Sequence, residues 1–178
     1  LEYLAVGLEV EPPLPRKIEL LRKAVALDPT NPSMYSHLGV AYVTAGRYED
    51  ALKLYLRALQ QGVRSPKLYG RIAELYLRKG NKDDAIAYYE KAAQVDPADT
   101  QAQNNLAMAY LETARASEAE RVFRRVLAID DRSADAYNGL GIIALQKQDL
   151  AEGRLDFERA IELDPDLLEA QVNLGVIY

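Results

Sequence analysis

Residues 26–35 read ALDPTNPSMY, and the Asp-Pro pair inside this stretch recurs along the chain. Asp28, Asp96 and Asp164 are each followed by Pro and lie 68 residues apart, which is twice 34. The two midpoints also carry turn residues, Gly62 in one case and an Asp-Asp pair in the other. Because the residue before a proline avoids the α-helical region, each Asp-Pro pair is expected to end a helix. The chain therefore contains a repeat with a period of 34 residues.

Alignment on this period brings residues of one kind into the same columns. The first half of each unit has an aromatic, an aliphatic, a small and a second aromatic column, as in Tyr35, Leu38, Gly39 and Tyr42. Their spacing of i, i+3, i+4 and i+7 defines one face of an α-helix. The first half of each unit is therefore predicted to be an amphipathic helix.

A second helical pattern follows a turn that contains Gly46 or Gly80. It has small and aromatic columns at i, i+4 and i+7, as in Ala51, Tyr55 and Ala58. Each unit thus consists of two helices of about 13 residues, which are too short to be stable alone and must pack on one another. No segment has the apolar–polar alternation of a strand, so the predicted fold is all-α.

The residues at the helix starts agree with this pattern. The expected N-cap positions carry side chains that can accept a hydrogen bond from free N–H groups: Asn31, Ser65, Asp99 and Ser133. Pro32 and Pro66 come next, at the first helical position, where the missing N–H has no cost.

In these columns the chain resembles the tetratricopeptide repeat, a helix pair with a 34-residue period. Four full repeats are predicted at 32–65, 66–99, 100–133 and 134–167, followed at 168–178 by the first helix of a further repeat. Residues 1–31 fit as a degenerate leading repeat, with Leu4 and Ala5 in the expected columns. The resemblance implies a right-handed α-α superhelix that forms a single array over residues 1–178.

Composition excludes several classes of function. The net charge of −5 argues against a general nucleic-acid binder, which needs a clustered positive surface. The chain has no cysteine and one histidine, so neither a thiolate metal site nor a histidine-based triad is expected. We predict no enzyme activity, no cofactor and no metal.

Hydropathy predicts a soluble chain without membrane insertion, because no run of 18 apolar residues occurs. The compartment is not assigned by the sequence; the cytoplasm is favoured, with the periplasm as the alternative. The chain begins at Leu1 and ends within an amphipathic pattern, which indicates a fragment of a larger protein.

A stack of such repeats presents an extended concave face, to which the first helix of each repeat contributes. Candidate partner-binding residues are those that face this groove. They are His37, Val40 and Thr44 in the first full repeat; Arg71, Glu74, Leu77 and Arg78 in the second; Asn104, Asn105, Met108, Leu111 and Glu112 in the third; Asn138, Ile142 and Leu145 in the fourth; and Asn173 in the last helix. Val40, Met108, Ile142 and Val176 form an apolar line along this groove, which indicates a surface to be covered by a partner. The alternative is that they pack between successive repeats.

The groove asparagines carry both a donor and an acceptor, so they can bond a peptide backbone in either sense. They resemble the tetratricopeptide region of protein O-GlcNAc transferases, in which an asparagine ladder holds extended peptides. His37, Arg71 and Gly139 interrupt the ladder in this chain, so it is partial.

A second comparison concerns the Hsp90- and Hsp70-binding tetratricopeptide proteins, which grip a peptide carboxylate. Lys67 and Arg71 match the basic pair of that clamp. The supporting columns carry Glu2, Val6 and His37 in place of the required Lys and Asn, which argues against a carboxylate clamp.

The main hypothesis is a protein–protein interaction scaffold that binds a peptide or helix of a partner protein. The alternatives are the substrate-selecting arm of a larger enzyme, such as an O-GlcNAc-transferase-like glycosyltransferase, and a self-assembling scaffold. Self-association through the uncapped last helix is expected because its apolar face lacks a mate. The charge balance, +2 in 32–65 and −5 in 134–167, also favours head-to-tail association. A catalytic domain in the full-length reading frame would identify the enzyme arm.

Overall fold

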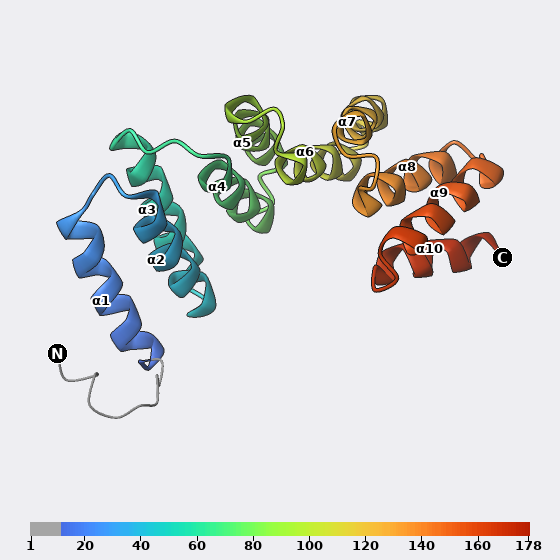
Figure 1. The fold of residues 1–178 in the computed structure, drawn as a ribbon. Coiled ribbons are helices and arrows are strands. Elements are labelled where there is room, and N and C mark those ends of the chain that lie inside the picture. Colours follow the sequence, from blue (N-terminus) through green and yellow to red (C-terminus); the bar gives the residue numbers. More distant parts are fainter. Residues whose placement is uncertain (1–11) are drawn as a thin grey trace. The chain divides into compact units, whose positions relative to one another are not determined.

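The computed structural model describes residues 12–178, which form ten α-helices and no strand. The helices are α1 (Leu14–Leu27), α2 (Pro32–Thr44), α3 (Tyr48–Gln60), α4 (Pro66–Arg78), α5 (Lys82–Val95), α6 (Thr100–Glu112), α7 (Ala116–Ile129), α8 (Ala134–Gln146), α9 (Leu150–Leu163) and α10 (Leu168–Ile177) (Figure 1). The all-α prediction is confirmed for this part of the chain. The sequence-based assignments of Glu2, Leu4, Ala5 and Val6 lie outside the described residues.

The helix starts are stabilised by the predicted caps. The side chains of Asn31, Asp99 and Ser133 accept hydrogen bonds from the backbone N–H groups of the first turns of α2, α6 and α8. The Ser65 hydroxyl accepts one from the N–H of Leu68 at the start of α4. Each cap satisfies a donor that the helix itself leaves free, so these helix boundaries follow from local chemistry.

The turns inside the helix pairs share one backbone conformation. Gly46 and Gly80 have φ angles of 72° and 81°, in the left-handed region that the sequence pattern anticipates for glycine. Ala114 and Gln148 lie at the same repeat position and have φ angles of 58° and 62°. These two residues adopt the turn in spite of the steric cost that a Cβ brings there.

The chain divides into two compact units, Leu1–Leu68 and Tyr69–Tyr178. In the first unit α2 packs against both α1 and α3. Tyr35 and Tyr55 are almost fully buried in its core, and the ring of Tyr55 lies directly against Gly39. The small-residue column thus lets an aromatic side chain of the second helix contact the backbone of the first.

The second unit extends from Tyr69 through α10. Each helix from α5 onward packs against the next, and α6, α8 and α10, the first helices of successive pairs, also contact one another in turn. Figure 1 shows α8, α9 and α10 packed together at the C-terminal end of this unit. Phe123 and Phe157 are fully buried and lie against Gly139 and Gly141 respectively. Phe157 and Gly141 belong to the predicted aromatic and small-residue columns, whereas Gly139 lies outside the small-residue column, so the contact of Phe123 with the next pair was not predicted.

None of the helices within residues 12–178 is both long and apolar enough to cross a bilayer.

Candidate functional site

The predicted groove residues fall in both units. His37, Val40 and Thr44 lie on α2 in the first unit and are exposed, with Val40 at 43%. The Thr44 hydroxyl donates to the Val40 carbonyl oxygen at 3.0 Å. All other candidates lie on α4, α6, α8 and α10 of the second unit. The second unit therefore brings together most of the predicted site.

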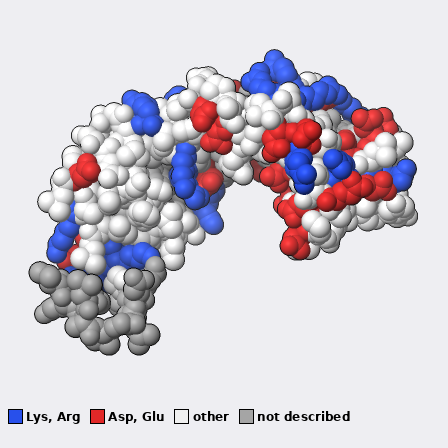
Figure 2. Space-filling model, in the orientation of Figure 1, with Lys and Arg blue, Asp and Glu red and all other residues white. Residues whose placement is uncertain are grey.

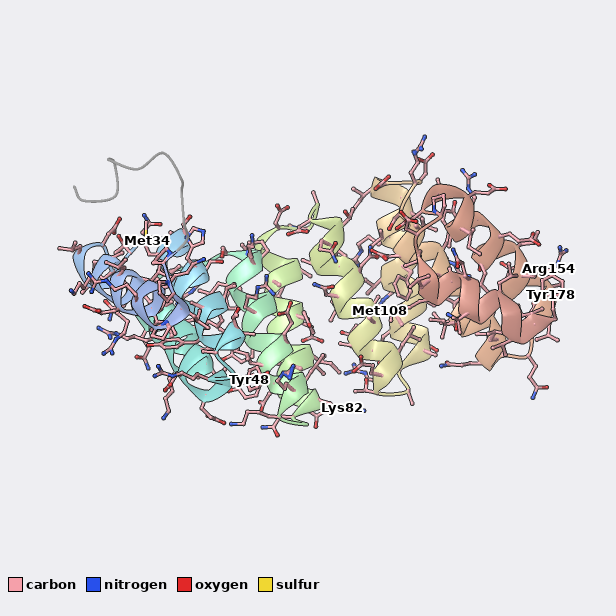
Figure 3. All side chains as sticks on the ribbon, turned by 90° about the horizontal axis from the view of Figure 1, so that it is seen from below. Met34, Tyr48, Lys82, Met108, Arg154 and Tyr178 are labelled. Carbon is pink, nitrogen blue, oxygen red and sulfur yellow. The ribbon has the colours of Figure 1, made fainter. Side chains whose placement is uncertain are left out.

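Three apolar candidates occupy one position on three first helices that contact in turn. Met108 on α6 and Ile142 on α8 are partly buried, whereas Val176 on α10 is 72% exposed. Figure 3 labels Met108 on α6. We call Met108, Ile142 and Val176 the apolar strip. It forms a surface along the first-helix side of the second unit.

The neighbouring leucines are used largely for packing. Leu77 and Leu111 are partly buried against the core that contains Phe123, and Leu145 against the core around Phe157. Met108 and Ile142 also contact these cores with part of their side chains. Packing between repeats, the alternative stated above, therefore accounts for much of the leucine surface.

Two of the candidate asparagines are not available to a peptide. Asn104 and Asn138 are 5% and 3% exposed. The Nδ2 of Asn104 donates to the hydroxyl of Ser133 at 3.1 Å, and the Nδ2 of Asn173 donates to the Oδ1 of Asn138 at 3.1 Å. These amides join α6 to the start of α8, and α8 to α10. The expectation that Asn104 and Asn138 bind a peptide backbone is corrected accordingly.

Asn105 differs from these two buried asparagines. It is partly exposed, and its Oδ1 accepts from the Nε2 of Gln101 at 3.2 Å on the same helix. The Asn105 amide can therefore replace its exposed hydrogen bond to Gln101 with a hydrogen bond to a partner at a low cost in free energy.

Two of the four charged candidates form an ion pair with each other. Arg71 Nη1 lies 2.9 Å from Glu74 Oε2, in an exposed pair of the i,i+3 type. Arg78 and Glu112 are exposed. The backbone carbonyl oxygen of Glu112 accepts from Nζ of Lys82, which Figure 3 labels at the start of α5, at 3.0 Å. Exposed pairs of this kind contribute little to stability and leave their charges accessible to a partner.

Within residues 12–178 no three His, Asp or Glu side chains come together as a metal site would require.

The sequence reasoning missed two cavities between second helices. One, of about 300 Å³, lies among α7, α8 and α9 and contains Glu120, Asp149, Glu152 and Asp156. Burial, reinforced by the neighbouring Glu152, raises the pKa of Asp156 to about 6. The other, of about 360 Å³, lies among α1, α2 and α3. The sequence signal for both cavities is the set of charged residues that recur on the second helices of the repeats.

The helix pairs with interlocking aromatic and small columns define a helical-repeat scaffold protein. Sequence models of the tetratricopeptide repeat match residues 30–98, 76–143 and 134–167, which together span most of the chain. The chain belongs to the tetratricopeptide repeat family. Its members are generally scaffolds for protein–protein interaction and not enzymes. A comparison with curated proteins found no match.

Solved structures share the fold. YrrB, described as a TPR protein with an unusual peptide-binding site, is 24% identical with a TM-score of 0.73, over 89% of this chain and 82% of that chain. BtubC from P. vanneervenii is 26% identical with a TM-score of 0.73, over 93% and 80%. The first TPR of Spaghetti (RPAP3), bound to the HSP90 peptide SRMEEVD, is 28% identical with a TM-score of 0.58, over 63% and 89%.

Proposed function

We propose that the chain is a peptide-binding scaffold whose second unit holds a segment of a partner protein along the apolar strip. The observation that carries the proposal is the continuity of Met108, Ile142 and Val176 across three contacting first helices, all with surface left uncovered. Apolar side chains aligned across several elements form a surface whose burial by a partner is favourable.

Polar groups beside the strip supply orientation. Asn105 precedes Met108 by one helical turn on α6 and offers its amide to a backbone group. Arg78 and Glu112, both exposed, provide charges of opposite sign at the ends of α4 and α6. A partner segment with an apolar side chain at regular intervals fits this arrangement, because the strip residues repeat with the helices. Binding of peptides by structural neighbours, YrrB and RPAP3 by their descriptions, supports the same use of the fold.

The test is selection of binding peptides by phage display on the wild-type chain, followed by affinity measurement on variants. Val176→Glu is the sharpest variant, because a side chain that is 72% exposed can be changed without disturbing the core. Leu155→Glu on α9 is the matched control, since Leu155 is also exposed, at 58%, but lies outside the strip. We expect the selected peptides to bind at least about tenfold more weakly to Val176→Glu, and unchanged to Leu155→Glu.

Asn105→Ala tests the amide separately, with an expected loss of about threefold to tenfold. Sedimentation of each variant shows whether the exposed face of α10 causes self-association, and affinities are compared on the monomeric fraction. Equal affinities for Val176→Glu and Leu155→Glu would show that the strip is not the binding surface.

A further inference from the structure

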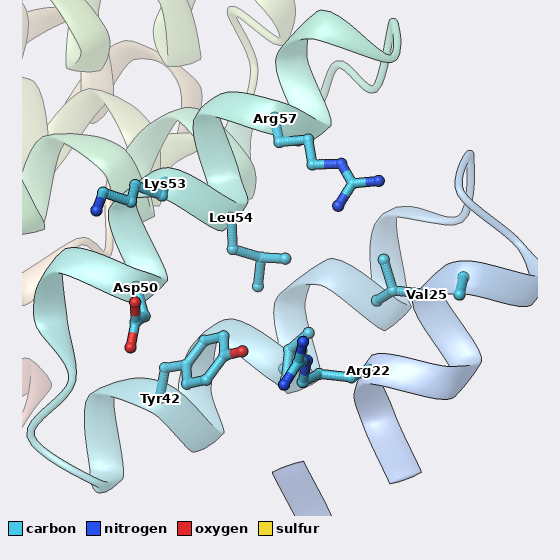
Figure 4. A pocket seen from close by; sticks show the side chains of 9 residues that line it. Arg22, Val25, Tyr42, Asp50, Lys53, Leu54 and Arg57 are labelled. Atoms are coloured by element: carbon cyan, nitrogen blue, oxygen red, sulfur yellow. The ribbon is translucent and has the colours of Figure 1, made fainter. Parts of the chain in front are cut away.

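The first unit contains a cavity of about 360 Å³ between α1 and α3, closed on its inner side by α2. Val25 and Leu38 are 6% and 2% exposed and form an apolar floor together with Leu54 and the buried Tyr42. Figure 4 shows Leu54 between Arg57 on α3 and Arg22 on α1. The size is in the range of cavities that hold a ligand side chain and its flanking groups.

The rim of this cavity carries an uncompensated positive charge. Arg22, Lys53 and Arg57 line it and are exposed. Within residues 12–178 none of these three side chains makes an ion pair or a hydrogen bond. Among the described residues that line the cavity, only Asp50 carries a carboxylate, and it is already paired with Arg47 at 2.6 Å. The cavity thus combines an apolar floor with three cations that no carboxylate of residues 12–178 pairs with.

The balance of charge around this cavity differs from that of the equivalent cavity in the second unit. The cavity among α7, α8 and α9 lies three repeat lengths further along the chain, and four of its nine lining residues are carboxylates. There Asp156 occupies the position of Leu54, and Arg124, at the position of Arg22, is paired with Glu120. Figure 2 shows acidic side chains gathered on the C-terminal part of the second unit. Arginines stand at the positions of Arg22 and Arg57 in both units, but Arg124 of the second unit is paired with a carboxylate of its cavity lining, whereas Arg22 has no such partner among residues 12–178.

We propose that this cavity docks an acidic peptide segment that carries an aliphatic side chain between its carboxylates. The aliphatic side chain enters the floor at Leu54 and Val25, and the flanking carboxylates pair with Arg22 and Arg57. Charge-assisted pairs with arginine are strong when the carboxylate accepts from two N–H groups of the guanidinium at once. Burial of the aliphatic side chain on the apolar floor adds a favourable contribution that carboxylates alone would not provide.

A peptide fits the cavity better than a nucleic acid does. The floor is aliphatic, and Tyr42, the aromatic ring on the lining, is 7% exposed and already covered by the Arg47 guanidinium at 4.6 Å. Single-stranded nucleic acids need exposed rings on which bases can stack. This surface is independent of the apolar strip, because it lies wholly within the first unit.

The probe is a fluorescein-labelled peptide with one leucine flanked on each side by three glutamates, measured by fluorescence anisotropy. We expect the charge reversal Arg22→Glu/Arg57→Glu to weaken binding at least about tenfold. Arg121→Glu/Arg125→Glu on α7 makes the same change in net charge at exposed residues outside the cavity, and we expect binding to it to fall less than about twofold.

Leu54→Asp tests the floor and reproduces the residue that the fold already holds at Asp156. We expect this variant, and a peptide with serine in place of leucine, to lose at least about fivefold in affinity. Circular dichroism confirms that each variant is folded. The proposal is overturned if the wild-type chain does not bind the probe, if the α7 control weakens binding as much as the cavity variant, if the serine peptide binds equally, or if a single-stranded oligonucleotide of equal charge binds more tightly.

Discussion

Gly141 on α8 offers a direct test of how the helix pairs interlock. A Cβ at this position would lie 2.6 Å from Cε1 of Phe157, whereas carbon atoms in ordinary contact are about 3.5–4.0 Å apart. Phe157 is fully buried against Ala160 and Ala170, so its ring cannot move away without disturbing the core. We therefore expect Gly141→Ala to force α8 and α9 apart.

The size of the effect follows from two opposing contributions. An extra methyl group in a packed core costs about 1–3 kcal/mol, and replacing glycine by alanine inside a helix stabilises by about 1 kcal/mol. Because both the ring and the helix backbone are held in place, we expect a net loss of about 1–2 kcal/mol. Gly175 lies at the same repeat position on α10, and a Cβ there meets no atom within 4 Å. Gly175→Ala should therefore be neutral or stabilising by up to about 1 kcal/mol.

The assay is urea unfolding followed by far-UV circular dichroism, with hydrogen exchange of the α8 and α9 amides as a local readout. Hydrogen exchange is needed because repeat arrays can unfold in parts. Faster exchange in α8 and α9 for Gly141→Ala, without such a change for Gly175→Ala, is the expected result. If Gly141→Ala were as stable as Gly175→Ala, the close contact of Phe157 with α8 would not determine the packing of this pair.

Three further predictions concern the turns, the acidic cavity and the buried amides. Ala114→Gly and Gln148→Gly should each raise the free energy of unfolding by about 1 kcal/mol in urea titrations, because both residues have left-handed φ angles that glycine adopts without strain; no change would show that these turns are unstrained. Burial raises the pKa of Asp156 from 3.8 to about 6, so the folded state holds the proton more tightly and stability is lost as pH rises from about 4 to 6. Asp156→Asn should remove this dependence of stability on pH and be about 1–2 kcal/mol more stable than the wild type at neutral pH. This value is smaller than the full pKa shift would give, because the Asp156 carboxyl is partly exposed to solvent. An unchanged dependence of stability on pH would show that Asp156 is not the group that titrates. Asn138→Ala should cost about 1–3 kcal/mol and speed amide exchange in α10, whose Asn173 it releases; unaltered exchange in α10 would show that this amide pair does not hold the helix.

Local chemistry allowed much of the fold to be predicted. The caps at Asn31 and Ser133, the prolines at the first helical positions, and the left-handed turns at Gly46 and Gly80 act within a few residues of the chain, so their effect can be judged without a neighbour. The 34-residue period extends this local information to every repeat. It also placed the residues of the apolar strip on one side of their helices.

The burial of each candidate depended on the neighbouring repeat. Asn104 and Asn105 are adjacent and chemically identical, but one is buried against Ser133 and the other remains partly exposed. The pattern of α6 alone did not show this difference, since the partner of Asn104 is 29 residues away and belongs to the next helix pair. Tertiary packing thus decided which amides are structural.

What the sequence by itself determined is the repeat, the positions of the helices and the face that each helix buries, because these depend on backbone sterics and on apolar spacing within about one turn. Only the tertiary structure decided which charged side chains meet. Arg22 and Arg57 come from different helices, and the free positive charge around Leu54 exists because packing of α1 and α3 on α2 brings them to one cavity. Electrostatic interaction depends on distance in space and on burial, and neither quantity can be obtained from the order of residues.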